Sequence, residues 1–214
     1  MSEVFIVGFN GSPRKNGNTM KMLSVALKAA EYEGANTKIY HLYDYEIKQC
    51  KGCLCDDLLR CKYPCEIEDD MKLLYDEIIK ADGLIIASPI YWYNVSAPVK
   101  NLIDRMTIFE NSIFIEGNCP TEGKVAGIIA AGNDSGCISV ISNLYAVLNS
   151  MGFSIPPWAL AYKNSNRLLD EEENRVLDAA NVGRVVTIMA KVLKDKKIGW
   201  FNNKLLEKLH IHST

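Results

Sequence analysis

The 214-residue sequence contains no long apolar run and no basic leader. A helix needs about 20 predominantly apolar residues to span a bilayer, but polar residues 10–15 interrupt the first apolar run, Val4–Phe9, at once. No cluster of lysine or arginine precedes that run, as a secretory signal would require. We therefore expect a cytoplasmic protein without a membrane span or a signal peptide.

An excess of charge of one sign is also missing. The chain has 24 lysines and arginines against 26 aspartates and glutamates, which gives a formal net charge of −2. Nucleic-acid-binding domains usually present a basic face, so we expect no nucleic-acid partner. The chain has only three histidines, and their positions follow no metal-binding spacing that we recognise.

Two common nucleotide-binding signatures are absent. A P-loop requires Gly-x4-Gly-Lys-Ser/Thr, whereas Gly17 is followed by Asn18 and Thr19. A dinucleotide fingerprint requires Gly-x-Gly-x-x-Gly, and the run from Gly8 to Gly11 does not supply it. These absences exclude a P-loop and a dinucleotide-binding turn after the first predicted strand.

The sequence does contain a regular alternation of predicted strands and helices. Short β-branched and apolar runs predict five strands, at Val4–Phe9, Thr37–Tyr43, Gly83–Pro89, Lys124–Gly132 and Phe153–Trp158. Apolar stripes of helical period lie between them, and a last long helix is predicted to open near Leu169, where Asp170 and Glu173 have capping-box spacing. This order predicts an α/β fold: a doubly wound parallel sheet with helices on both faces.

We expect one domain with two additions. Residues 1–195 would form the domain, and residues 47–66 would be a cysteine-rich loop inserted into it. Residues 196–214 would be a C-terminal helical extension that docks on the domain or on a neighbouring subunit.

The loop after the first predicted strand, NGSPRKNGNT, is rich in neutral hydrogen-bond donors. The first β–α turn of such a sheet is a favoured phosphate site, because the N-terminus of the following helix presents free N–H groups. Four side chains offer hydroxyl or amide donors, and Arg14 adds a positive charge; the four are Ser12, Asn16, Asn18 and Thr19. We interpret the loop as a monophosphate site, with an ordinary polar connector as the alternative.

Two further loops follow the third and fourth predicted strands. SPIYWYNVSAPVKNLIDRM (residues 88–106) places aromatic side chains beside the expected phosphate site, and AAGNDSG (residues 130–136) is small enough to let a ligand approach the backbone. Helix capping and core packing are the alternative roles. Together the three loops predict a mononucleotide with a planar ring.

In order and spacing, these three motifs resemble the FMN loops of the NADPH-dependent FMN reductase family, and the resemblance is weak beyond Pro157. It implies a flavodoxin-like fold with strand order 2-1-3-4-5. It also implies that Ser12, Arg14, Asn18 and Thr19 hold the FMN phosphate while Asn16 and Gly17 shape their loop. The same resemblance places the isoalloxazine against Pro89, Ile90, Tyr91, Trp92 and Asn94, with Gly132 and Asn133 completing the site.

The cysteine-rich stretch resembles the iron–sulfur flavoprotein branch of that family. The branch motif is Cys-x2-Cys-x2-Cys, a short gap, and a last Cys before Ile-x-Asp-Asp-Met. Cys50, Cys53 and Cys65 match it, but position 56 is Asp56. Cys55 and Cys61 are the further candidates. Four of the five cysteines suffice for a [4Fe–4S] cluster; a structural zinc site and free thiols remain open alternatives.

The resemblance implies an oxidoreductase that takes a hydride from NAD(P)H and reduces a flavin, a quinone or another small acceptor, with the cluster as a relay. No catalytic side chain is expected, because the flavin carries the chemistry. A non-enzymatic electron carrier or redox sensor is the alternative. The family also implies a homodimer or homotetramer.

Overall fold

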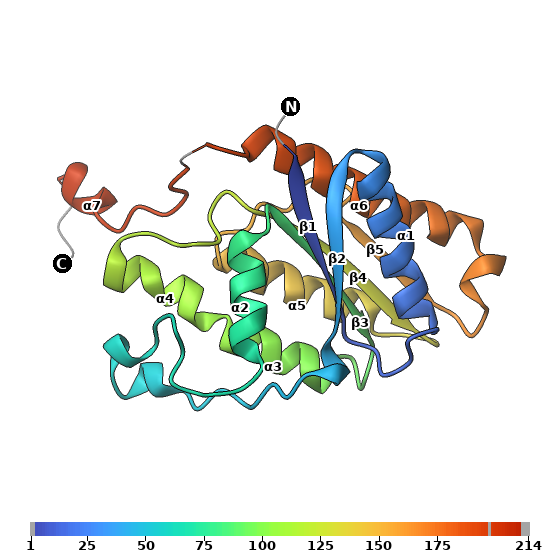
Figure 1. Cartoon of the computed structure of the whole chain (residues 1–214), viewed down its shortest axis with the longest axis horizontal. Coiled ribbons are helices and arrows are strands. Elements are labelled where there is room, and N and C mark those ends of the chain that lie inside the picture. Colours follow the sequence, from blue (N-terminus) through green and yellow to red (C-terminus); the bar gives the residue numbers. More distant parts are fainter. Residues whose placement is uncertain (1–2, 197, 211–214) are drawn as a thin grey trace.

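The computed structural model describes residues 3–196 and 198–210. Five parallel strands form one sheet in the order β2-β1-β3-β4-β5 (Figure 1). Their bounds are β1 Val4–Asn10, β2 Ala35–His41, β3 Gly83–Pro89, β4 Val125–Gly132 and β5 Leu160–Asn164. The three central strands are almost fully buried apolar runs, as expected of parallel strands covered on both faces. The predicted fold class and strand order are confirmed.

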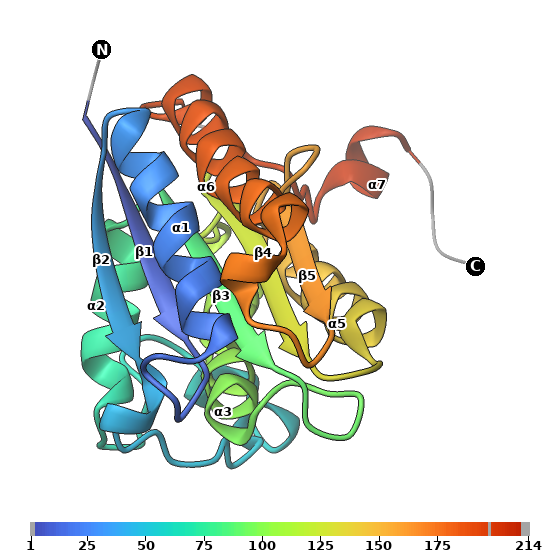
Figure 2. The same cartoon turned by 90° about the vertical axis from the view of Figure 1, so that its right-hand side faces the viewer.

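Helices cover both faces of the sheet (Figures 1 and 2). On one face, α1 (Asn18–Tyr32) packs against α6 (Glu173–Leu193). Their contact is close at Gly183, where an added Cβ would lie 1.7 Å from the carbonyl oxygen of Ala26. The other face carries four helices, and each contributes to the larger of the two apolar cores: α2 Met71–Lys80, α3 Ala97–Arg105, α4 Thr107–Glu116 and α5 Cys137–Ser150.

The predicted fifth strand was wrong in position. Only Ser154 of the segment 153–158 pairs with β4, through a single bridge to Val125. Pro156 and Pro157 then remove the N–H donors that a ladder needs, so the regular strand begins only at Leu160.

One helix boundary and one additional helix also differ from expectation. Residues Leu169–Glu171 form a separate 3₁₀ turn, in which Glu171 accepts a hydrogen bond from the backbone N–H of Leu168, and α6 begins only at Glu173. The predicted pairing of Asp170 with Glu173 therefore does not cap this helix. The second difference is α4, a helix that the periodicity analysis did not identify.

The C-terminal segment extends away from the layers (Figures 1 and 2). Its short helix α7 (Leu205–Lys208) is exposed. The ring of Phe201 packs edge-on against the ring of Phe114 on α4, with 6.1 Å between the ring centroids. The backbone N–H of Phe201 donates to Glu122. The predicted extension therefore touches the domain near residue 201, although residues 197 and 211–214 lie outside the described residues. None of the helices in the described ranges is long and apolar enough to cross a membrane.

A buried ion pair fixes the cysteine-rich segment to α3. The guanidinium of Arg105 lies 2.6 Å from the Asp69 carboxylate, and both side chains are almost fully buried. Arg105 also donates to the carbonyl oxygens of Lys48 and Ile67, at the two ends of the segment. Arg105 is thus an internal anchor between α3 and this segment.

Replacing Arg105 with leucine should destabilise the fold strongly. The substitution leaves the Asp69 charge buried without a partner, which typically costs about 3–5 kcal/mol. The free energy of unfolding in urea measures the effect. The matched control is Asp104→Asn, which removes an exposed pair with Lys100 and should change stability by at most about 0.5 kcal/mol. Equal small losses for both variants would contradict the assigned anchoring role.

Candidate functional site

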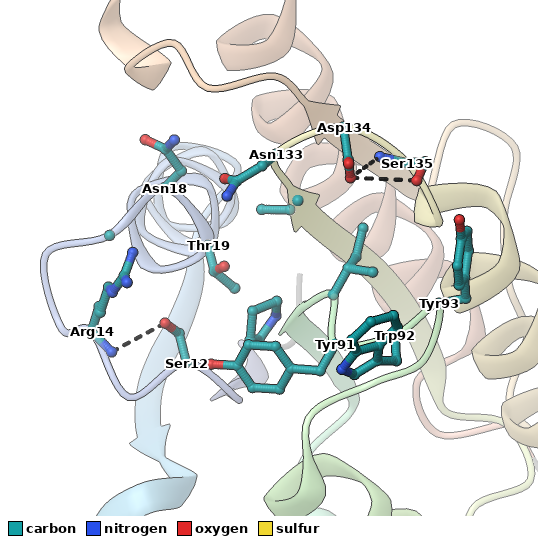
Figure 3. Close-up of a pocket in the computed structure, with 15 residues that line it drawn as sticks. Ser12, Arg14, Asn18, Thr19, Tyr91, Trp92, Tyr93, Asn133, Asp134 and Ser135 are labelled. Atoms are coloured by element: carbon teal, nitrogen blue, oxygen red, sulfur yellow. Dashed lines mark hydrogen bonds between the residues drawn. The ribbon is translucent and has the colours of Figure 1, made fainter.

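A cavity of about 440 Å³ lies at the carboxyl ends of β1, β3 and β4. Its size falls in the range of about 300–1,000 Å³ that is usual for small-molecule sites. Figure 3 shows Ser12, Arg14 and Thr19 on one side and the aromatic residues on the other. The lining residues are Ser12, Arg14, Gly17, Asn18, Thr19, Pro89, Ile90, Tyr91, Trp92, Tyr93, Ala131, Gly132, Asn133, Asp134 and Ser135.

Asn10, at the end of β1, shapes the loop that follows. Its side-chain oxygen accepts from the backbone N–H of Ser12 at 3.1 Å, and its amide group donates to the carbonyl of the same residue. The hydroxyl of Ser12 in turn accepts from the backbone N–H of Arg14 at 3.1 Å. These local bonds replace regular secondary structure and hold the loop in a turn.

The N-terminus of α1 lines this cavity. Gly17 is the N-cap residue, and no side chain caps the helix. The helix begins at Asn18, and the N–H groups of its first turn are therefore left for a ligand. Arg14 is the one cationic side chain among the described lining residues. This end of the cavity is suited to a phosphate group.

Two residues expected at the phosphate behave differently from the rest. Asn18 lines the cavity, but its side chain binds a distant segment: it donates to the carbonyl of Arg167 and accepts from the N–H of Leu169. Asn16 is not among the lining residues. Phosphate contacts from these two side chains stay predictions.

The loop after β3 forms a tight turn with an energetically unfavourable backbone conformation. Tyr91 and Asn94 exchange two backbone hydrogen bonds of 3.0 and 3.1 Å, and the residues between them, Trp92 and Tyr93, have φ values of 51° and 64°. Positive φ at both central positions is the geometry in which asparagine and glycine are preferred. Two aromatic residues are held there instead, and Trp92 is 94% exposed at the rim of the cavity.

Asn94 supports this turn rather than the cavity. Its side-chain oxygen accepts from the N–H of Val95 at 2.8 Å, and it is not a lining residue. Its expected contact with a ring system stays a prediction. Burial raises the pKa of the Tyr43 hydroxyl, and Tyr91 adds to that rise.

The loop after β4 closes the third side. An added Cβ at Gly132 would lie 2.7 Å from the side chain of Ile90, so the absence of a side chain lets the two loops approach. Sequence reasoning selected Gly132 and Asn133 here but not Asp134 and Ser135, which also line the cavity. The Asp134 carboxylate accepts from the N–H and the hydroxyl of Ser135.

The five cysteines of the inserted segment are free thiols and do not line this cavity. Cys53 and Cys61 are buried, Cys65 is half-buried, and Cys50 and Cys55 are exposed. Burial, together with the nearby thiols of Cys53, Cys50 and Cys65, raises the pKa of the Cys61 thiol to about 12. Within residues 3–196 and 198–210, no three cysteine, histidine or carboxylate side chains are grouped as a metal site.

The thiols nevertheless fit an iron–sulfur cluster in kind and number, because four thiolates bind a [4Fe–4S] cluster. The remaining cysteines, Cys119 and Cys137, are buried. Their neighbours are ordinary core groups: Cys119 lies beside Thr121, and Cys137 donates to the carbonyl of Lys163.

Comparison with known proteins identifies the family of this chain. The sequence model of the family described as "NADPH-dependent FMN reductase" matches residues 4–166. The chain belongs to this family. The match includes all three loops of the cavity and the whole cysteine-rich segment, and ends two residues after β5.

Several curated relatives of this family member are iron–sulfur flavoproteins. One from Archaeoglobus fulgidus is 40% identical over 124 residues, which cover 58% of this chain and 52% of that protein. One from Methanosarcina thermophila is 34% identical over 128 residues, covering 59% and 62%. The matched segments thus span about half to three fifths of the relatives' own length.

Solved structures confirm the flavodoxin-like fold. RosB with a bound intermediate, 8-demethyl-8-formylriboflavin-5'-phosphate, superposes with a TM-score of 0.76 at 22% identity, over 90% of this chain and 81% of that one. A flavodoxin from the domain Archaea gives a TM-score of 0.57 at 13% identity, over 87% and 98%. At these identities the likeness shows the fold alone.

A methyl group added at Gly11 should disturb the loop after β1, which forms one side of the cavity. An added Cβ there would lie 2.2 Å from Cγ2 of Val99 on α3 and 3.1 Å from the carbonyl oxygen of Ala87 on β3. Since valine is stiff at χ1, Gly11→Ala should push the first loop away from α3 and cost about 1–3 kcal/mol of stability. A flavin titration and a urea titration of the same variant measure the two consequences.

The control for this variant is Gly199→Ala, because no heavy atom of the described residues, apart from those of its two chain neighbours, lies within 4 Å of a Cβ at Gly199. Its stability should stay within about 0.5 kcal/mol of the parent. Unchanged stability and flavin affinity in Gly11→Ala would show that the loop does not depend on this close contact.

Proposed function

We propose that this chain is an FMN-dependent oxidoreductase that takes a hydride from NAD(P)H and reduces a small acceptor such as a flavin or a quinone. The observation that carries the proposal is a single cavity that joins the uncapped N-terminus of α1 and Arg14 to an aromatic wall. A phosphate at one end and a flat ring at the other make FMN the ligand that matches this arrangement.

The phosphate end supplies donors and one charge. Ser12, Thr19 and the N–H groups at the start of α1 would donate to phosphate oxygens, and Arg14 would balance part of their charge. Lys15, the neighbouring cation, pairs with Asp44 at 2.5 Å and is not a lining residue. The phosphate end thus binds an anion without a side chain that would cleave it.

The other end of the cavity would hold the flat ring by its shape. Pro89, Ile90 and Tyr91 form one wall, and the close approach of Gly132 to Ile90 keeps the opposite loop near it. Trp92 and Tyr93 stand at the rim and are 94% and 61% exposed, where a second planar group such as a nicotinamide can stack. Bound FMN supplies the hydride chemistry. The chain orients the reactants.

Two more parts of the proposal concern the whole protein. We infer that the exposed aromatic rim and the projecting segment 198–210 are contacts of a homodimer or homotetramer, and that residues 1–195 form the flavin domain. An iron–sulfur cluster on the cysteine-rich segment would pass electrons between the flavin and a partner.

Removal of the Arg14 charge should weaken FMN binding selectively. Arg14→Gln should raise the FMN dissociation constant about 10- to 100-fold, because a hydrogen bond to a charged group contributes about 1.5–3 kcal/mol. Riboflavin lacks the phosphate, so its dissociation constant should not change. Fluorescence titration with both ligands measures the difference.

Lys15→Gln is the matched control and should leave both dissociation constants unchanged. An equal loss of riboflavin and FMN affinity in Arg14→Gln would mean that Arg14 supports the loop and does not bind the phosphate.

The reductase activity is tested on FMN-loaded protein without oxygen. Addition of NADH or NADPH should abolish the visible flavin absorption, and added quinone or FMN should then give steady turnover. Dithionite is the positive control for flavin reduction. If dithionite reduces the bound flavin but neither nucleotide does, the chain is an electron carrier and not a reductase.

A further inference from the structure

The loop after β1, which forms the phosphate end of the cavity, depends on a side chain that does not line the cavity. Asn10, the last residue of β1, is 0% exposed and is not a lining residue. Its side-chain oxygen accepts from the N–H of Ser12 at 3.1 Å, and its amide group donates to the carbonyl of Ser12 at 3.3 Å. One amide thus holds both backbone groups of Ser12, so the course of the loop follows the position of Asn10.

These two bonds leave the Asn10 amide with a single orientation. If its oxygen and nitrogen exchanged places, two donors would face each other at the Ser12 N–H and two acceptors at the Ser12 carbonyl. Of the two hydrogens on the amide nitrogen, Ser12 uses one. The second needs an acceptor of its own, because Asn10 is fully buried and a buried donor without a partner is costly.

His41 supplies that acceptor. It is the last residue of β2 and pairs in register with Asn10 in the parallel sheet. Its Nδ1 lies 3.0 Å from the amide nitrogen of Asn10. A neutral imidazole has one donor nitrogen and one acceptor nitrogen. Since the Asn10 nitrogen can only donate, Nδ1 is the acceptor, and the ring hydrogen is on Nε2.

A second contact joins this end of β2 to the same loop, but it is of a different kind. Lys15 pairs with Asp44, and both side chains are about half exposed. Exposed ion pairs contribute little to stability. The contact of His41 is made instead to a buried amide that holds Ser12, a residue that lines the phosphate end. Of the two contacts, the one through His41 is therefore expected to fix the loop.

We propose that His41, in its neutral Nε2–H form, is a positioning residue for the phosphate end of the cavity. It holds the amide of Asn10, which in turn holds Ser12 and the loop. The ligand group whose binding it controls is the phosphate monoester of the bound nucleotide and not the ring. This rests on the proposed function as an FMN-dependent protein.

Two variants at position 41 test this role. His41→Leu removes the acceptor and keeps apolar bulk, whereas the shorter amide of His41→Asn places an acceptor close to the position of Nδ1. His41→Leu should raise the dissociation constant of FMN about 3- to 10-fold, which corresponds to the loss of one hydrogen bond, and leave that of riboflavin unchanged. His41→Asn should restore FMN binding to near the parent value. Fluorescence titration measures both constants.

Lys15→Gln is the matched control in the same loop and should change neither constant. Equal FMN affinity of the parent and His41→Leu would overturn the proposal. So would an equal loss in His41→Leu and His41→Asn, or a loss of riboflavin affinity as large as that of FMN affinity, because either result would give His41 a general structural role.

A double-mutant cycle tests whether His41 acts through Asn10. Asn10→Ala removes the amide that His41 holds, so the further change His41→Leu should weaken FMN binding no more than Asn10→Ala does alone. Groups that act on each other give losses that do not add, whereas independent groups give additive losses. Additive losses of FMN affinity would show that His41 does not act through Asn10 and would overturn the proposal.

Two measurements need no ligand and so separate this proposal from the proposed function. In the parent protein, ¹⁵N NMR of the neutral imidazole of His41 should show the hydrogen on Nε2, and a hydrogen on Nδ1 would overturn the proposal. The amide hydrogen of Ser12 should exchange with solvent faster in His41→Leu than in the parent, and at the parent rate in His41→Asn. If the parent binds neither FMN nor riboflavin, the proposed function fails, while these two measurements still decide whether His41 holds the loop.

Discussion

Buried polar contacts at the two ends of α3 connect both candidate cofactor regions to the sheet. At its start, the Ser96 hydroxyl donates to the carbonyl of Gly11 at 2.7 Å, and the Ser96 N–H donates to Ser88 of β3. At its end, Arg105 binds Asp69 and the carbonyls that flank the cysteine-rich segment. Unpaired polar groups are costly to bury, so these contacts hold both loops in a fixed relation to one helix.

Strain at the cavity rim depends on this framework. Non-glycine residues with positive φ cost about 1–3 kcal/mol each when the surroundings enforce them, and Trp92 and Tyr93 are consecutive. The turn is secured on both sides, by the Tyr91–Asn94 bonds and by the fully buried Ser96 just beyond it. A rigid base therefore allows two large aromatic side chains to project where a ligand ring would lie. Their exposure is typical of a binding surface rather than a core.

The sequence predicts those parts of the protein that depend on local chemistry. Apolar runs located four of the five strands, and the three polar loops that follow β1, β3 and β4 do meet in one cavity. The fifth strand was predicted too early in the chain, at Phe153–Trp158, whereas β5 begins at Leu160. A short apolar run indicates a strand but does not take account of the N–H donors that its prolines lack. The hydrogen bonds of Asn18 to Arg167 and Leu169 were not predicted, because these partners lie about 150 residues away in the sequence. Such long-range pairing leaves no local pattern.

The buried role of Arg105 was missed for the same reason, and it explains how the cysteine-rich segment behaves as a unit. Arg105 and Asn101 hold its first residues through the carbonyls of Lys48 and Ile47, and Arg105 holds its last residues through Asp69. Between these ends, Asn111 of α4 donates to the carbonyls of Leu58 and Cys61, and Asp76 of α2 accepts from the hydroxyl of Tyr63. The segment is therefore attached to α3 at its two ends and to α2 and α4 at its centre. Contacts with three helices compensate for its lack of long regular elements, which is why it packs as one unit against the larger apolar core.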